Sequence, residues 1–292
     1  MAEGLILETL PERRRWRPRV ILRRHLVGVV GVTILVLLGL AAVAAPVIAP
    51  SDPLSQDAPA LQRPSLSHPF GTDVLGRDVL SRVVYGARIS LGIGFVAVII
   101  GVLGGSLVGV VSAYFGGWVD YLVQRLVEVV LAFPLLILLL VIVAAVGTSV
   151  QSVTLVIGVV MVPIMSRIVR AIVLAEKELP YVEAARSVGA SDMRILFLHL
   201  FPSVFPLAAI LASIALGGAI MAEAALSFLG AGVPPPNPAW GTDLSGNARL
   251  YFQNAPWLAI FPGLALSLTI LGANLLAEAV RDVVDPFGQG MR

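Results

Sequence analysis

The sequence predicts an all-α integral membrane protein with six transmembrane helices, and three observations support this fold class. Apolar residues make up 58% of the 292 residues and charged residues only 13%, and the mean hydropathy of +0.93 is far above that of a soluble domain. Six stretches are apolar over roughly the 20 residues that a helix needs to cross a bilayer core. Fifteen of the 20 Lys and Arg fall on one side of the membrane if these stretches cross it in turn, as in multi-pass membrane proteins.

The six predicted spans differ in strength. The fourth is the weakest, because Pro163 lies near its end and only three residues separate it from the third span. This short gap predicts a tight helical hairpin. Pro134, Pro163 and Pro262 are expected to bend the spans that contain them. In chain order the predicted spans are 26–47, 91–111, 126–146, 150–165, 206–229 and 258–277.

The distribution of basic residues predicts that both termini lie in the cytoplasm. With the N-terminus inside, 15 of the 20 Lys and Arg fall on inner segments, seven of them within residues 1–25. A cleaved signal peptide is an alternative for this region, but an apolar run of about 22 residues is too long for a signal peptide core. A nucleic-acid patch is another, but basic residues beside a span more often anchor topology and contact anionic lipid.

The chain divides into four parts. Residues 1–25 form a basic cytoplasmic tail, and residues 26–90 contain the first span and an extracytoplasmic loop. Residues 91–287 form a core of five spans with a long inner segment at 166–203, and residues 288–292 form a C-terminal tail.

Several classes of chemistry are excluded or disfavoured. The absence of cysteine excludes disulfides, thiolate nucleophiles and Cys-ligated metals. A P-loop needs a lysine followed by Ser or Thr, whereas the one lysine, Lys177, precedes Glu178. Three histidines lie at different predicted depths, which disfavours a shared metal site. Three intramembrane glutamates are few and dispersed, which disfavours a membrane enzyme and a secondary carrier. These residues are His25, His68, His199, Glu128, Glu223 and Glu278.

The first outer loop, residues 48–90, ends in a predicted amphipathic helix. Its apolar positions recur at helical spacing, and Asp78 and Arg82 are four residues apart, which predicts an ion pair between them. Such a helix would lie on the outer membrane surface or cover a translocation path, and the sequence leaves both open. In the second outer loop, residues 231–256, Trp240 is expected to anchor the chain at the membrane interface.

Two patterns within the spans indicate packing or a pathway. Gly101, Gly105 and Gly109 fall on one helix face, a spacing that lets two helices approach closely in lipid. Glu223, with Ser227 one turn later, is a candidate pathway residue. A structural hydrogen bond to a neighbouring helix is an equally weighted interpretation of Glu223.

The inner segment 166–203 is too long and too polar to be a simple connection. Pro180 predicts the start of a short helix that carries Glu183 near its N-terminus, and Gly189 predicts its end. Ser191 is expected to cap the next helix. A small helix held out from the membrane has the shape to dock into a groove on a partner.

Several motifs resemble those of ABC importer permeases. The inner segment resembles the EAA loop of that family through Glu183, Ala184, Ala185, Gly189 and the run from His199 to Pro202. The outer-loop signature of the dipeptide, oligopeptide and nickel permeases is matched from His68 to Leu91. Its matching residues include Gly71, Asp73, Gly76, Arg77, Asp78, Arg82 and Arg88. Further matches are the run 226–230, Trp240-Gly241, Pro262-Gly263, Asn274 and the end segment with Arg281, Asp282, Asp285 and Pro286.

The resemblance covers residues 20–287 and implies the "C" type permease subunit of such an importer, with the type I importer permease fold. It implies that Glu183, Ala184, Ala185, Gly189 and Pro202 couple the chain to ATPase subunits. It further implies a heterodimer with a homologous "B" type permease, two cytoplasmic ATPases that bind ATP and Mg²⁺, and an extracytoplasmic substrate-binding protein. No cofactor is expected in this chain. The implied location is the cytoplasmic (inner) membrane of a bacterium or archaeon, and the implied cargo is di- or oligopeptide, with nickel or glutathione-like solutes as alternatives.

Overall fold

The computed structural model describes residues 18–284 of the chain, with side chains from 26 to 282. Within these residues the regular structure is helical, apart from one isolated antiparallel bridge between Thr72 and Asp78. The predicted all-α class is confirmed. The tails at 1–17 and 288–292 lie outside the described residues, as do Asp285 and Pro286.

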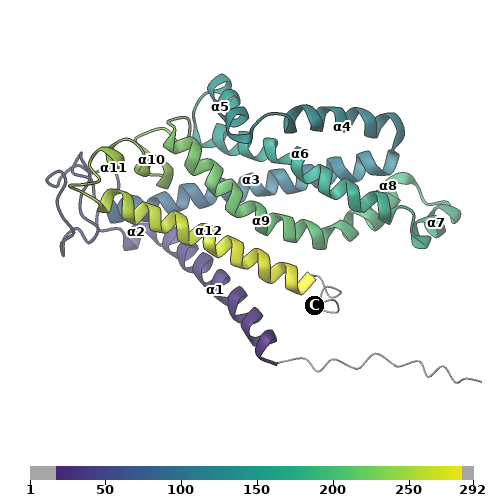
Figure 1. Ribbon diagram of the computed structural model, residues 1–292, viewed down its shortest axis with the longest axis horizontal. Coiled ribbons are helices and arrows are strands. Elements are labelled where there is room, and N and C mark those ends of the chain that lie inside the picture. Colours follow the sequence, from purple (N-terminus) through teal and green to yellow (C-terminus); the bar gives the residue numbers. More distant parts are fainter. Residues whose placement is uncertain (1–17, 285–292) are drawn as a thin grey trace, which may run out of the picture.

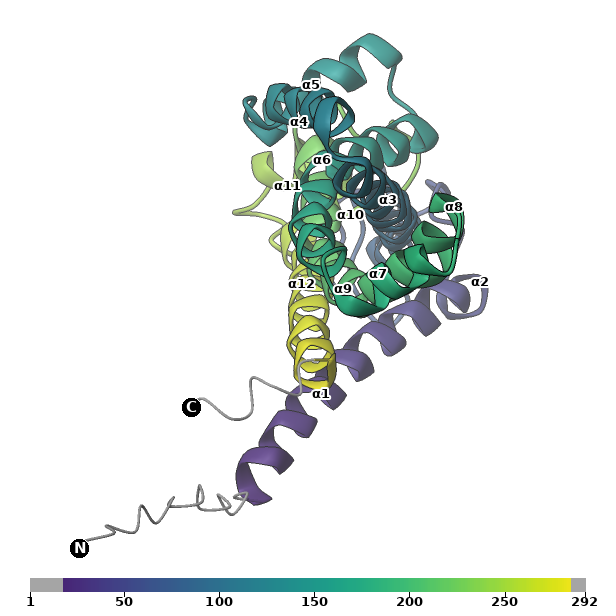
Figure 2. The ribbon, with the colours of Figure 1, turned by 90° about the vertical axis from the view of Figure 1, so that its right-hand side faces the viewer.

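Five long helices form the bundle, and each is long and apolar enough to cross a membrane. They are α1 (Pro18–Val43), α3 (Val79–Phe115), α6 (Val150–Glu176), α9 (Phe201–Phe228) and α12 (Trp257–Val284). Figures 1 and 2 both place α1 and α12 on one side of the bundle and α4 and α5 on the other. A sixth span exists only if α4 and α5 are counted together.

The third predicted span is broken rather than straight. It consists of the end of α4 (Gly117–Leu131) and the whole of α5 (Leu135–Val146), which are bent by 94° relative to each other. Pro134 precedes α5 with an extended ψ of 128°, so the helical hydrogen-bond ladder stops there and starts again. The proline predicts a bend, and the structure shows a nearly right-angled turn between α4 and α5.

Two elements that the hydropathy pattern separates are one helix. The amphipathic segment of the outer loop and the second span together form α3, which is continuous over 37 residues. At 1.5 Å per residue this helix is about 55 Å long, against about 30 Å for a bilayer core. The amphipathic segment is therefore the end of a spanning helix, and its residues Ser81 and Arg82 are buried.

The predicted inner segment 166–203 is largely helical. Helix α6 continues through Pro163 and beyond the predicted end of the fourth span to Glu176. Three short elements follow, namely α7 (Pro180–Ser187), α8 (Asp192–Ile195) and the π-helix η1 (Leu196–Leu200), and η1 leads directly into α9. The projecting part is therefore only residues 177–191, because the chain from Asp192 onward continues as one helical run to Phe228.

Glycines bring α3 and α6 into close contact, as their spacing predicts. A Cβ on Gly105 would lie 2.3 Å from the Cβ of Met165, and one on Gly109 would lie 2.6 Å from the carbonyl oxygen of Ser166. Such backbone-level packing replaces the hydrophobic force that is absent in lipid. These contacts form within one chain and build the main apolar core.

The bundle has two distinct ends (Figure 1). At one end, called the loop end here, lie residues 49–78 together with α10 (Trp240–Leu244) and α11 (Asn247–Leu250). Short helix α2 (Ala45–Ile48) leads from α1 into this region. At the opposite end lie α7 and α8. The two groups of sequence-predicted site residues are found at these two ends.

Candidate functional site

The first group lies in the coupling segment, defined as residues 180–189. Pro180 is the first residue of α7, Glu183 lies in its first turn, and Gly189 follows the helix with a φ of +81°. Because this region of φ favours glycine, Gly189 allows the chain to turn back toward the bundle. Ser191 occupies the N-cap position of α8, but its side chain makes no capping hydrogen bond, so that expectation is wrong.

Only one face of α7 is attached to the bundle. Val182 is fully buried and Ala185 nearly so, and both belong to the main apolar core. Glu183, Ala184 and Val188 are exposed, and 84% of Val188 is open to solvent. The carboxylate and the small residues of the motif are therefore free to contact another protein, while Ala185 fixes the helix to its own chain.

Hydrogen bonds hold the elements around α7 to the long helices. The hydroxyl of Tyr114 in α3 donates to Asp192 Oδ1 at 2.6 Å, and Lys177 Nζ donates to the carbonyl oxygen of Ala113 at 3.0 Å. Tyr181 donates to Glu176 Oε2 at 2.6 Å. Burial, together with this hydrogen bond to a carboxylate, raises the pKa of Tyr181 to about 12.

Pro202 is separate from the other residues of the predicted coupling motif. It is the second residue of α9 and is exposed. Because η1 continues into α9 without an extended residue between them, Pro202 lies inside a continuous helical run, where its missing N–H removes one backbone donor.

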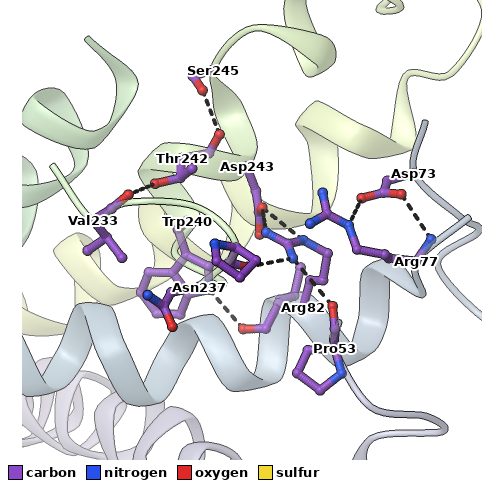
Figure 3. Close-up of polar contacts among 12 residues, drawn as sticks. Pro53, Asp73, Arg77, Arg82, Val233, Asn237, Trp240, Thr242, Asp243 and Ser245 are labelled. Carbon is purple, nitrogen blue, oxygen red and sulfur yellow. Dashed lines mark hydrogen bonds and ion pairs between the residues drawn. The ribbon is translucent and has the colours of Figure 1, made fainter. Parts of the chain in front are cut away.

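The second group lies at the loop end, where an ion pair joins two distant segments (Figure 3). Arg82 of α3 donates to Asp243 Oδ1 of α10 through Nε at 3.0 Å and also through a second guanidinium nitrogen. Both side chains are mostly buried, with exposed fractions of 5% and 14%. Arg82 also donates to the carbonyl oxygens of Pro53 and Pro236, so one guanidinium connects α3 to both loops.

The pairing of Asp78 with Arg82 is therefore wrong. One oxygen of Asp78 accepts from the backbone N–H of Ser81 at 2.7 Å and caps α3, and the other lies 2.9 Å from His68 Nδ1. A carboxylate at the N-cap position accepts from backbone N–H groups in the first turn of its own helix. It therefore does not reach the side chain one turn later.

Asp73 and Arg77 form a second ion pair next to the first (Figure 3). Arg77 Nε donates to Asp73 Oδ2 at 2.6 Å, and Asp73 Oδ1 accepts from the backbone of Leu75 and Arg77. Gly76 closes this turn with a φ of +75°, and a Cβ there would lie 2.1 Å from the carbonyl oxygen of Ala58. Gly71, also at a positive φ, lies against Trp257.

Two tryptophans fasten the loops to the helices. Trp240 is fully buried and donates through Nε1 to the carbonyl oxygen of Val83 at 2.9 Å. Trp257 donates to the carbonyl oxygen of Thr72 at 3.1 Å. Trp240 is thus a core residue of the loop end, and the expectation of an interfacial anchor is wrong.

A cavity of about 390 Å³ lies between the two loops and the start of α3. Its charged lining residues are the four members of the two ion pairs, Asp73, Arg77, Arg82 and Asp243. Burial raises the pKa of Asp243, and the neighbouring Arg82 opposes this shift. The arrangement pairs each arginine with an aspartate, and it contains no group of three metal ligands within the described residues.

The candidate pathway residues lie inside the protein. Glu223 is fully buried, and its Oε1 accepts from the hydroxyl of Ser227 at 2.8 Å. Ser227 Oγ in turn accepts from the backbone N–H of Val233 at 3.0 Å. This chain of hydrogen bonds ties the second loop to the end of α9, and Ser227, the partner of Glu223 Oε1, lies one turn along the same helix.

Arg88 differs from the rest of the loop-end signature. It is exposed, and it lines a different, largely apolar groove between α1 and α3. The signature residues are therefore not one site. Sequence reasoning missed Asp243, the partner of Arg82, because a single aspartate 161 residues away in a loop carries no local signal.

Comparison with known proteins decides the family. Residues 89–287, more than half of the chain, match the family model described as binding-protein-dependent transport system inner membrane component. This chain belongs to that family. Residues 13–69 match the model of the N-terminal transmembrane domain of oligopeptide transport permease C. The resemblance to a "C" type ABC importer permease is confirmed.

Curated relatives agree with the family models. The dipeptide transport system permease protein DppC of Alkalihalophilus pseudofirmus is 40% identical over 205 residues, which cover 70% of this chain and 67% of the relative. The glutathione transport system permease protein GsiD of Pectobacterium atrosepticum is also 40% identical over 205 residues, with coverages of 70% and 68%. These relatives are transport permease subunits and not enzymes.

A solved structure supports the fold. A chain from an inward-facing form of the MetNI methionine ABC transporter superposes with a TM-score of 0.55 at 22% identity, covering 70% of this chain and 94% of that chain. The family models and the curated relatives together make the protein a permease subunit of an ABC importer in the inner membrane. Its family works with a further permease, ATPases and a binding protein.

Proposed function

We propose that this chain forms half of the translocation path of an importer for short peptides. The observation that carries the proposal is the 40% identity to a dipeptide permease and to a glutathione permease over the same length. Glutathione is itself a small peptide-like solute, so both relatives favour short peptides over sugars or metal ions. Glutathione is the second candidate substrate, and it rests on the GsiD relatives.

We further propose that the coupling segment receives the force of ATP hydrolysis from partner ATPases. In support, Glu183 and Ala184 are exposed on a helix whose opposite face is buried through Val182 and Ala185. A helix attached on one face transmits a push to the helices that it contacts. ATP and Mg²⁺ would bind to the ATPases and not to this chain.

The proposed arrangement in the membrane follows the distribution of Lys and Arg. The end with α7 and both termini face the cytoplasm, and the loop end faces outward toward a substrate-binding protein. A homologous "B" type permease would complete the path, and two ATPases would bind below.

The test is ATPase activity in vesicles that contain this chain, its partner permease and the ATPases. The binding proteins are supplied empty, loaded with dipeptide or loaded with glutathione. Stimulation by the dipeptide-loaded protein supports the peptide assignment, and stimulation by the glutathione-loaded protein alone shifts it to the second candidate. If neither protein stimulates ATPase activity while nickel-loaded protein does, the peptide proposal fails.

A matched pair of glycine variants tests the coupling segment. Gly189 and Gly230 have φ values of +81° and +82°, and a Cβ added to either residue would have no atom within 4 Å. Gly189→Val and Gly230→Val therefore impose similar strain of about 1–3 kcal/mol at opposite ends of the bundle. Loss of ATPase stimulation is expected for Gly189→Val, and much smaller loss for Gly230→Val. Equal loss in both would contradict a specific role of the coupling segment.

A further inference from the structure

The groove beside Arg88 is the feature that the proposed function leaves unexplained. It lies between α1 and α3 with one contribution from α9, has a volume of about 410 Å³ and is lined by apolar side chains and glycines. Its lining residues are Leu35, Gly39, Ala42, Val43, Arg88, Leu91, Gly92, Phe95 and Leu216. Arg88 is the one charged residue among them.

The shape of the groove comes from its glycines. A Cβ on Gly39 of α1 or on Gly92 of α3 would have no atom within 4 Å, so each glycine leaves open space rather than close helix contact. This contrasts with Gly105, where the second helix fills the space. On α3 the lining residues Arg88, Leu91, Gly92 and Phe95 follow the i, i+3, i+4, i+7 spacing and form one face.

The charge of Arg88 is uncompensated among residues 26–282, where it has no ion pair and no side-chain hydrogen bond. Its closest described interaction is with Tyr85, whose ring centroid is 6.0 Å away, at the outer limit of a cation–π contact. The other signature arginines, Arg77 and Arg82, each pair with an aspartate. Arg88 therefore has free guanidinium donors at an exposed position.

The depth of Arg88 matches the level of lipid headgroups. Helix α3 runs from Val79 to Phe115, so its midpoint is Ala97. With the bilayer centred on this midpoint, a core of about 30 Å accommodates roughly 20 residues of α3, which places the core boundary close to residue 87. Arg88 then lies at this boundary on the loop side, while Leu91 and Phe95 extend into the hydrocarbon region.

We propose that this groove binds one membrane phospholipid, with the phosphate on the Arg88 guanidinium and an acyl chain along Gly92 and Gly39. Guanidinium recognises phosphate with paired hydrogen bonds, and an apolar groove of this kind is complementary to an acyl chain. A free phosphate would use only the arginine, and a peptide would leave its polar backbone against apolar walls. A phospholipid is the ligand that uses both parts of the groove.

The test is native mass spectrometry of the assembled transporter containing the full chain. The transporter is first equilibrated in nanodiscs of phosphatidylethanolamine and phosphatidylglycerol and then released into mild detergent. Arg88→Gln removes the headgroup contact, and Gly92→Leu fills the groove where a side chain meets no atom of the protein. The matched controls are Arg249→Gln, another exposed arginine of the loop end, and Gly218→Leu, another helical glycine with open space around it.

Each groove variant is expected to retain about one phospholipid fewer per copy than the wild type, whereas the controls retain the wild-type number. Equal retention in all variants would overturn the proposal. Loss in Arg88→Gln but not in Gly92→Leu would indicate that the groove takes no acyl chain, and would also overturn it. If Arg88→Gln abolishes peptide-stimulated ATPase activity with lipid retention unchanged, Arg88 serves transport rather than lipid.

Discussion

The loop end and the coupling segment differ in how their residues are held. At the loop end, buried charged and aromatic side chains connect segments that are far apart in sequence, as Arg82 does with Asp243 and Trp240 with the backbone of Val83. In the coupling segment the contacts with the bundle are few and mostly apolar, and Val182 is the fully buried residue.

Because their contacts differ, the two ends differ in how easily they move relative to the bundle. A buried ion pair and a buried indole break only at a cost of several kcal/mol, so the loops and helix starts move together as one body. A helix attached through one apolar face opens and shifts more readily, because few buried contacts resist it. The coupling segment, which would receive the push from the ATPases, therefore shifts more readily than the loop end, which contains the cavity.

The largest expected effect is at Trp240. Trp240→Ala removes a fully buried indole and its hydrogen bond to Val83, which should destabilise the chain by about 3–5 kcal/mol. Thermal unfolding of the purified protein in detergent measures this as a lowered midpoint. The control is Trp118→Ala on α4, where 75% of the side chain is exposed. A midpoint for Trp240→Ala equal to that of the control would show that the loop end is not the rigid body described.

Arg82→Gln should have the next largest effect and destabilise the chain by about 3 kcal/mol. The variant leaves Asp243 buried without the guanidinium that stabilises its charged form. Burial already raises the pKa of Asp243, and the variant raises it further. A carboxyl with a raised folded-state pKa costs stability progressively as pH rises from its unfolded pKa of about 4 to the folded value, and the cost levels off above it, so the defect should be larger at about pH 8 than at about pH 5.

Chemical unfolding at the two pH values checks this expectation. Arg125→Gln is the control, since its ion pair with Glu128 is more than half exposed and contributes little to stability. A defect of Arg82→Gln that is independent of pH would mean that loss of Arg82 does not move the pKa of Asp243 within the range between the two pH values.

In the coupling segment the expected effects are smaller. Val182→Ala removes two buried methyl groups and should cost about 1–2 kcal/mol. Hydrogen exchange of residues 180–190 should quicken, while exchange at the loop end stays unchanged. Val188→Ala, at a position that is 84% exposed, should change neither. Faster exchange at both ends in Val182→Ala would mean that the two ends unfold as one unit.

The smallest expected effect is at Tyr114. Tyr114→Phe removes the hydrogen bond to Asp192 and should cost about 1 kcal/mol. The amide exchange of α8 should increase, with little change in the midpoint of thermal unfolding. Tyr121→Phe on α4 is the control, because half of Tyr121 is exposed. No change in α8 exchange would show that α8 is held by its apolar residues alone.

Much of the fold follows from local sequence signals. The long apolar runs predict the long helices, and the glycine spacing on α3 predicts a close helix contact, which the structure makes with α6. Pro180 predicts the start of α7 because proline fixes φ at a helical value. Gly189 predicts its end because glycine permits a positive φ. These features depend on residues within a few positions of one another.

The wrong predictions concern features that depend on contacts between residues far apart in the sequence. The pairing of Asp78 with Arg82 fails because Asp78 caps its own helix and Arg82 reaches a residue of the second loop. Pro134 signals a break, but the angle of 94° depends on how α4 and α5 pack on α6. Trp240 resembles an interfacial residue because burial by a folded loop is not visible in a hydropathy pattern.

Lys177 gives the protein a practical property for labelling. It is the single lysine in a chain without cysteine, and its Nζ contacts the carbonyl oxygen of Ala113 at the junction between α6 and the coupling segment. Acylation would remove both the charge and this contact. An amine-reactive reagent therefore modifies one side chain only, apart from the α-amino group, and its rate at Lys177 reports how often Nζ leaves the carbonyl oxygen of Ala113. A built-in probe of this junction exists without any substitution.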